Sequence, residues 1–159
     1  CCKSMPDTDI AKLNLTDTQI TDAGLAHIIG LRGLFNLRLT NTPITDAGLK
    51  QLIALPALRT LYASGTQITD AGMEHIIEYP ALRALFIADT QITDTGLNAL
   101  TSVPLRALDL TNTQITDAGL EQIKKITSLK LLYVSRDQIT DSGIQGLEET
   151  LPELLIELE

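Results

Sequence analysis

A fixed repeat period constrains this chain more than any other feature of its sequence. The octapeptide TQITDAGL occurs at residues 18–25 and again at 113–120, and near-copies lie at 42–49, 66–73, 90–97 and 137–144. Successive Thr-Asp pairs begin 24, 24, 24, 23 and 24 residues apart, at Thr21, Thr45, Thr69, Thr93, Thr116 and Thr140. A period in the twenties is typical of a solenoid, in which each repeat is one structural unit stacked on the next.

Two patterns of apolar residues recur within each repeat. An L-x-L segment, such as Leu37 to Leu39, alternates with the two-residue period of a short strand. A later segment, in which Leu120 and Ile123 are typical, has the i, i+3 spacing of a helix buried on one side. We therefore expect an α/β solenoid of about six strand-turn-helix repeats, with a parallel sheet on the concave face and helices on the convex face.

The pattern L-x-x-L-x-L-x-x-T-x-I-T-D-x-G-L-x-x-I, which covers residues 12–150, resembles leucine-rich repeats of the Thr-Asp-x-Gly-Leu kind. Such repeats abound in proteins of certain environmental bacteria and are similar to those of F-box substrate receptors. The resemblance implies a right-handed arc of 23–24-residue repeats, and a binding module whose partner the fold does not specify. This chain departs from the usual pattern by carrying Thr where most leucine-rich repeats have Asn and the F-box kind has Cys.

We divide the chain into an N-terminal tether or partial cap at 1–11, the repeat domain at 12–150 and a terminal capping strand at 151–159. Ile156 and Leu158 lie one period after Leu132 and Val134, which predicts one further strand at the C-terminus. Two interpretations are open at the N-terminus. Either Met5 and Ile10 cover the first repeat, or the chain continues upstream.

We expect structural roles for the repeated Thr residues. The first Thr of each motif lies where the chain leaves the strand, and its hydroxyl can bond backbone groups of its own turn and of the neighbouring turn. These residues form the expected structural ladder: Thr18, Thr42, Thr66, Thr90 and Thr113. The last repeat has Asp137 at this position, and an ionised Asp can only accept, so its turn should be differently bonded or more exposed.

The Thr-Asp pair directly precedes the expected helix, where a Thr or Asp can cap free N–H groups and an acidic charge suits the helix dipole. The predicted helix caps are Asp22, Asp46, Asp70, Asp94, Asp117 and Asp141. Six of the ten glycines follow two residues later. Because Gly is a poor helix former, its recurrence suggests a close approach between repeats or a special dihedral angle.

A row of carboxylates binding Ca²⁺ is the functional alternative for the Asp column. We favour capping, because Ca²⁺ takes about six to eight oxygen ligands and each turn offers one Asp. His27 and His75 lie two repeats apart, too far to share a metal. No glycine-rich phosphate loop, H-E-x-x-H or C-x-x-C motif occurs. We therefore expect no enzyme activity, no catalytic residue, no metal and no cofactor.

The net charge of −8 makes nucleic acid and anionic membranes poor partners. One basic column runs against this balance, just before the strands, at Arg59, Arg83, Arg106 and Lys130. The plainer interpretation is a solvated rim that pairs with acidic helix ends such as Glu78. The functional interpretation is a basic edge that holds an acidic partner, and we favour the former.

The middle residue of L-x-L varies from repeat to repeat and should point out from the concave face. Three of the five aromatic residues of the chain lie in this one column. We predict that a protein partner binds here, because exposed aromatic rings grouped together mark recognition surfaces. The predicted partner-binding residues are Arg38, Tyr62, Phe86, Asp109 and Tyr133. A structural explanation also stands, because aromatic residues suit strands and stack on one another.

Cys1 and a short polar tether resemble a bacterial lipoprotein after removal of its signal peptide, which makes Cys1 a possible lipidation site and favours the cell envelope. An excised domain is the competing interpretation and leaves a cytoplasmic location open. We expect a monomer that binds a protein partner, and that contacts a membrane only through a lipid on Cys1. The alternatives are an envelope-tethered spacer without a dedicated ligand, and the substrate-receptor arm of a larger assembly.

Overall fold

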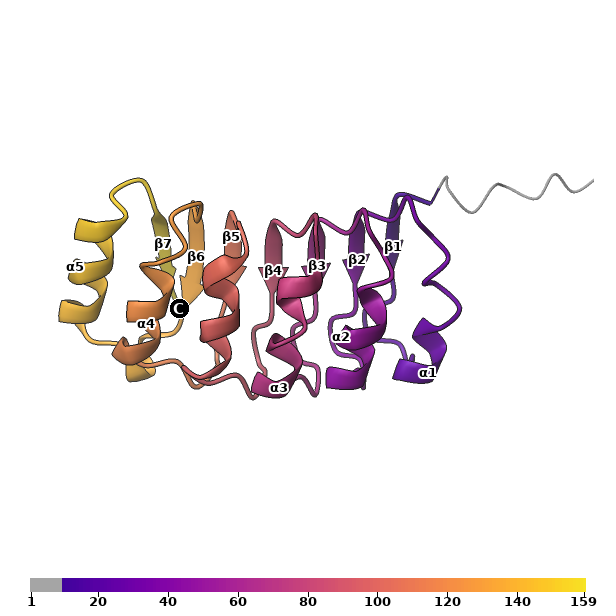
Figure 1. The fold of residues 1–159 in the computed structure, drawn as a ribbon. Helices are drawn as coiled ribbons and strands as arrows, with labels where there is room; N and C mark the ends of the chain where they lie inside the picture. The colour runs from indigo at the N-terminus through magenta and orange to yellow at the C-terminus, as the bar shows by residue number, and fades with distance from the viewer. Residues whose placement is uncertain (1–9) are drawn as a thin grey trace, which may run out of the picture.

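One short strand in each turn of the chain adds to a single open parallel sheet in the computed structural model, which describes residues 10–159 (Figure 1). The strands are β1 (Lys12–Asn14), β2 (Asn36–Arg38), β3 (Thr60–Tyr62), β4 (Ala84–Phe86), β5 (Ala107–Asp109), β6 (Leu131–Val134) and β7 (Leu155–Leu158). They are ordered as in the sequence, and each central Leu pairs with its equivalent one repeat on, as Leu37 does with Leu61. The predicted solenoid with a parallel sheet is confirmed.

The helical segments lie on the other side of the repeats and form the second layer in Figure 1. They are α1 (Asp22–Leu25), α2 (Asp46–Leu52), α3 (Asp70–Met73), η1 (Ile76–Glu78), η2 (Gly96–Ser102), α4 (Asp117–Ile123), η3 (Arg136–Gln138) and α5 (Asp141–Thr150), where η marks a 3-10 helix. The fourth repeat has η2 in place of the expected α-helix. This repeat is one residue short, and a 3-10 helix covers the same length with fewer residues because its rise per residue is larger.

The hydrophobic core lies between the two layers. The central strand residues Leu37, Leu61, Leu85 and Leu108 are fully buried, and so are helix residues such as Leu49 and Leu120. Burial of these columns holds the repeats together, and each repeat contributes the same positions. Tyr79 is a large polar member of this core, and its hydroxyl donates a 2.6 Å hydrogen bond to the carbonyl of Leu49. Burial raises the pKa of Tyr79 well above its usual range.

A column of left-handed residues follows the strands. Asp17, Asn41, Gly65, Asp89 and Asn112 all have positive φ angles between 53° and 67°. Asn, Asp and Gly are the residues that adopt this conformation at least cost, so this unpredicted column has a clear signal in the sequence.

The last repeat has Arg136 at the position of this column, and its turn becomes η3 instead. Asp137 is exposed there, as expected for a turn that differs from the others.

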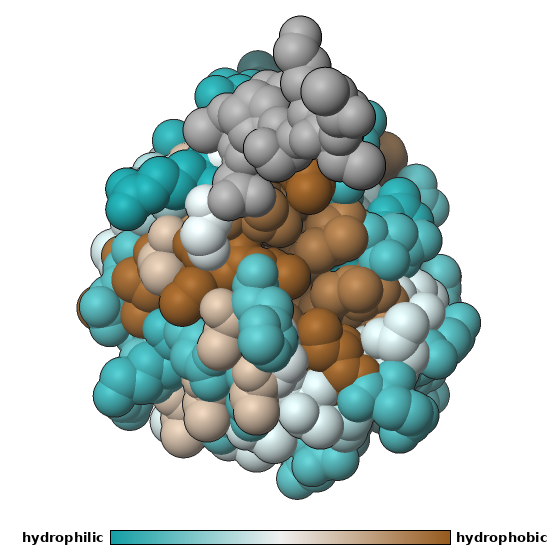
Figure 2. Space-filling view, turned by 90° about the vertical axis from the view of Figure 1, so that its right-hand side faces the viewer, coloured by the Kyte–Doolittle hydropathy of each residue, from teal (hydrophilic) through white to brown (hydrophobic). Residues whose placement is uncertain are grey.

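The two ends of the solenoid differ. Figure 2 shows apolar side chains gathered on the end face of the first repeat, where Leu13, Leu15 and Ile20 are only partly buried. Ile10 is 39% exposed, and the other expected cap residue, Met5, lies outside the described residues. At the C-terminus β7 pairs with β6 in the register that the repeat predicts, with Leu132 opposite Ile156 and Val134 opposite Leu158.

The helices of residues 10–159 are too short to cross a membrane.

Candidate functional site

The ladder threonines bond within their own turns. The hydroxyl of Thr42 donates to the carbonyl of Leu39 at 2.6 Å, and that of Thr66 to Ala63 at 2.6 Å. Thr18, Thr90 and Thr113 make the same bond, each to the residue three positions earlier. Within residues 10–159 none of these hydroxyls bonds a neighbouring turn, so the expected ladder is instead a stack of separate turns. Each strand end therefore satisfies its own carbonyl.

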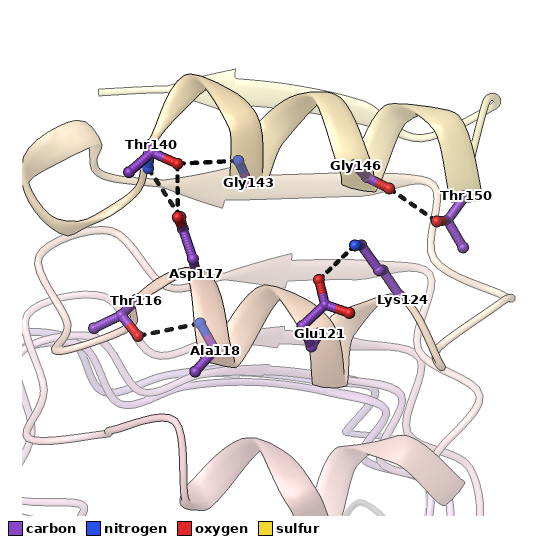
Figure 3. A network of polar contacts seen from close by, with 9 residues as sticks. All are labelled: Thr116, Asp117, Ala118, Glu121, Lys124, Thr140, Gly143, Gly146 and Thr150. Carbon is purple, nitrogen blue, oxygen red and sulfur yellow. Dashed lines mark hydrogen bonds and ion pairs between the residues drawn. The ribbon is translucent and has the colours of Figure 1, made fainter.

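The aspartates of the Thr-Asp pairs join consecutive repeats. Asp22 accepts a 3.0 Å hydrogen bond from the N–H of Thr45 on one oxygen and a 2.6 Å bond from its hydroxyl on the other. The same pair of bonds links Asp117 to Thr140, as Figure 3 shows. It also occurs from Asp46 to Thr69, Asp70 to Thr93 and Asp94 to Thr116. A carboxylate that accepts two hydrogen bonds from one residue is a strong, directional link between repeats.

The capping role predicted for these aspartates belongs to the preceding Thr. The hydroxyl oxygens of Thr45, Thr69 and Thr116 accept hydrogen bonds from the N–H two residues later, and that of Thr140 accepts from Gly143. Most Asp residues instead begin the helix, where their charge suits the dipole, while their oxygens point to the next repeat. Asp141 has no following motif, and its side chain is 94% exposed.

The glycine of each motif makes room for this carboxylate. A Cβ built on Gly96 would lie 2.5 Å from Oδ1 of Asp70, closer than non-bonded atoms can approach. Gly48, Gly72, Gly119 and Gly143 meet the aspartate of the preceding repeat in the same way. A close approach between repeats therefore explains the Gly column. The motif T-D-x-G is one joint, made by Asp of one repeat with Thr and Gly of the next.

The face of the sheet that is turned away from the helices, here called its outer face, carries the residues predicted to bind a partner. We call them the concave strip: Arg38, Tyr62, Phe86, Asp109 and Tyr133. The guanidinium of Arg38 lies 4.5 Å from the ring centre of Tyr62, within cation-π range. Tyr62 stacks on Phe86 with ring centres 4.4 Å apart and planes 9° from parallel. The parallel register aligns these three residues in neighbouring strands, so the stack follows directly from the repeat.

The strip is less exposed than we predicted, and Arg38, Tyr62 and Phe86 cover one another. Tyr62, Phe86 and Tyr133 are half-buried, and Arg38 is exposed. Asp109 interrupts the aromatic column, and one of its oxygens accepts bonds from the N–H and hydroxyl of Thr111, at 3.0 and 2.8 Å.

Two leucines that were not among the predicted site residues extend the apolar part of this face. Leu131 opens β6 and is half-buried, and Leu155 opens β7 and is 57% exposed. Their signal is the residue before each central strand position, which shares the outer face with the strip because strand side chains alternate.

The basic column forms a rim beside the strand starts. Arg59, Arg83 and Arg106 line an open hollow together with Pro80 and Ala81. The pairing that we expected with Glu78 is wrong: an oxygen of Glu78 lies 3.6 Å from Nδ1 of His75, the residue that directly precedes η1.

Lys130 is the one member of the basic column that pairs with an acid within residues 10–159. It bonds Glu153, and this contact lowers the pKa of that carboxyl through the hydrogen bond first and the charge second.

The leucine-rich-repeat family profile matches residues 9–28 and 101–124. No curated protein matches the sequence. Many solved structures match the fold, and all three described below come from bacteria.

A leucine-rich-repeat protein of Leptospira interrogans superposes with a TM-score of 0.67 at 22% identity over 94% of this chain. The internalin InlF of Listeria monocytogenes gives 0.69 at 23% identity over 96%. Internalin C2 of the same species gives 0.62 at 22% over 92%. This chain spans 37%, 48% and 69% of the lengths of these structures, respectively. The chain therefore has the leucine-rich-repeat fold, which commonly serves protein-protein interaction.

Proposed function

We propose that this chain is a non-enzymatic interaction module that binds a protein partner through the concave strip. The observation that carries the proposal is the aligned stack of Arg38, Tyr62 and Phe86 on the outer face of the sheet. Arg and Tyr are among the residues that dominate binding energy at protein interfaces. Rings already held by stacking lose little side-chain freedom when a partner binds, which favours affinity.

The surroundings of the strip support this proposal. The C-terminal half of the neighbouring column on the same face holds small or apolar residues, and Ala84, Ala107 and Leu131 are half-buried there. Leu155 adds an exposed apolar side chain at the C-terminal end of the face. Aromatic residues and Arg are enriched in protein interfaces, and Tyr62, Phe86, Tyr133 and Arg38 are of these types.

The test is a pulldown with the purified chain, in which bound proteins are identified by mass spectrometry. The triple variant Tyr62→Ala, Phe86→Ala and Tyr133→Ala should lose the partner that the unchanged chain captures. A matched control on the convex face, Glu74→Ala, Ile77→Ala and Asn98→Ala, removes three exposed side chains and should retain it.

Circular dichroism of each variant checks that the fold persists. Retention of the same partner by the folded strip variant would overturn the proposal, and so would its loss from the convex control alone.

A further inference from the structure

Three arginines of the basic column, Arg59, Arg83 and Arg106, form a positively charged patch on an otherwise acidic protein, and we call this patch the arginine rim. Arg59, Arg83 and Arg106 belong to consecutive repeats, so their Cα atoms are spaced as neighbouring strands are, about 5 Å apart. None of the three forms an ion pair within residues 10–159, although the chain carries 20 acidic residues. Three neighbouring guanidinium groups repel one another unless an anion lies between them.

Local structure keeps this rim open instead of neutralising it. Nη1 of Arg83 donates to the carbonyl of Leu82 at 2.6 Å, which fixes the guanidinium and leaves other donors free for a ligand. Glu78, the acid nearest in sequence to the hollow, contacts His75. Pro80 and Ala81 form the rest of the lining and contribute no acidic side chain.

We infer that the arginine rim (Arg59, Arg83 and Arg106) binds an acidic, carboxylate-bearing peptide segment. The inference rests on the proposed function, because it takes that segment to belong to the protein partner of the concave strip. Guanidinium groups bind carboxylates through paired hydrogen bonds, and a row with strand spacing suits acidic side chains of an extended chain. Arg59 directly precedes Thr60, which lies two residues before Tyr62 in β3, so one partner can contact the rim and the strip together.

A nuclear magnetic resonance titration with an octaglutamate peptide tests the rim directly. In 0.1 M salt, where charges beyond about 10 Å are screened, the amide shifts should change around residues 59, 83 and 106. The apparent Kd should rise when the salt concentration is increased. Shift changes confined to other parts of the chain, or no binding at all, would overturn the inference.

Charge-matched variants separate the rim from the overall charge. The variant Arg59→Gln, Arg83→Gln and Arg106→Gln takes the net charge from −8 to −11, and so does the control Arg32→Gln, Lys50→Gln and Lys125→Gln. We expect the rim variant to weaken octaglutamate binding by about fivefold or more, and the control by less than about twofold. Equal weakening in both variants would contradict the rim as the site.

A third variant, with Lys at the three rim positions, keeps the charge but loses the paired hydrogen bonds, so its affinity should lie between those of the unchanged chain and the Gln variant. A loss as large as in the Gln variant would contradict an electrostatic site. The strip variant Tyr62→Ala, Phe86→Ala and Tyr133→Ala should bind octaglutamate as the unchanged chain does. If the strip variant binds octaglutamate and still captures the partner, the proposed function alone fails. If octaglutamate does not bind at the rim while capture of the partner requires the strip, the rim inference alone fails.

Discussion

Both oxygens of Asp117 accept hydrogen bonds from Thr140 in the next repeat, one from its N–H at 2.9 Å and one from its hydroxyl at 2.6 Å. The same Thr140 hydroxyl accepts from the N–H of Gly143 at 3.1 Å and so caps α5 (Figure 3). One hydroxyl therefore joins a contact between repeats to the start of a helix. Five such joints run along the described chain, which explains why the motif letters vary so little.

Breaking one joint should destabilise the fold measurably. Asp46→Asn removes the charge from an oxygen pair that accepts bonds from Thr69 at 2.8 and 2.7 Å. We expect a loss of about 1 to 3 kcal/mol in the free energy of unfolding, measured by urea titration, because hydrogen bonds to charged groups contribute this much. The control is Asp141→Asn, whose carboxylate is 94% exposed and should change stability by less than about 0.5 kcal/mol. Equal losses in the two variants would rule out the joint as the cause.

The joint between Asp117 and Thr140 should make the stability of the fold depend on pH. The pKa of Asp117 is lowered, first by the hydrogen bond from the Thr140 hydroxyl and then by that from its N–H. A carboxyl whose pKa is lower in the folded state stabilises the fold above its unfolded pKa, near about 4, and this contribution is lost as pH falls through the folded pKa. The stability difference between the unchanged chain and Asp117→Asn should therefore shrink as the pH falls below about 4. Urea midpoints measured from pH 7 to pH 2 check this, and a difference that grows in acid would contradict it.

The glycine of the joint should not tolerate a methyl group. Ala is normally favoured over Gly in a helical segment, by about 1 kcal/mol. At Gly96 we expect the opposite sign, a loss of about 1 to 3 kcal/mol, because the added Cβ meets Oδ1 of Asp70. Thermal or urea unfolding measures the change. Gly30→Ala is the control, since nothing lies within 4 Å of a Cβ there.

A double variant identifies the clash itself. If the methyl group at Gly96 is destabilising because of the Asp70 carboxylate, the combined loss in Asp70→Ala with Gly96→Ala should be smaller than the sum of the single losses. Strictly additive losses would show that the methyl group is rejected by something other than the carboxylate.

The repeat period predicted the strands, their parallel order and the core, because stacked identical units place identical residues in register. Leu37, Leu61 and Leu85 occupy the same position in consecutive repeats, and stacking of the repeats buries each of them in the same way. The role of Asp46 was less accessible, because a Thr-Asp pair before a helix fits a local cap equally well. Only the stacking distance shows that its carboxylate reaches Thr69 of the next repeat.

Other features differ in how far the sequence could reveal them. The left-handed column was readable, since Asn41, Gly65 and Asp89 are the residue types that this conformation favours. The pairing of Lys130 with Glu153 was not, because it depends on the path of the chain after α5. The stack of Tyr62 on Phe86 lies between these cases: the column was predicted, and the ring geometry required the structure.

The buried hydroxyl of Tyr79 should contribute to stability through a single bond. It donates to the carbonyl of Leu49 in α2, thirty residues earlier, and Tyr79 is only 3% exposed. Tyr79→Phe keeps the ring but leaves that carbonyl without this donor, so we expect a loss of about 1 to 2 kcal/mol in urea unfolding. Tyr133→Phe provides the matched control, because this ring is half-buried on the outer face. The free energy of unfolding should change by less than about 0.5 kcal/mol in this variant. An unchanged unfolding midpoint in Tyr79→Phe would contradict a stabilising role for the bond between neighbouring repeats.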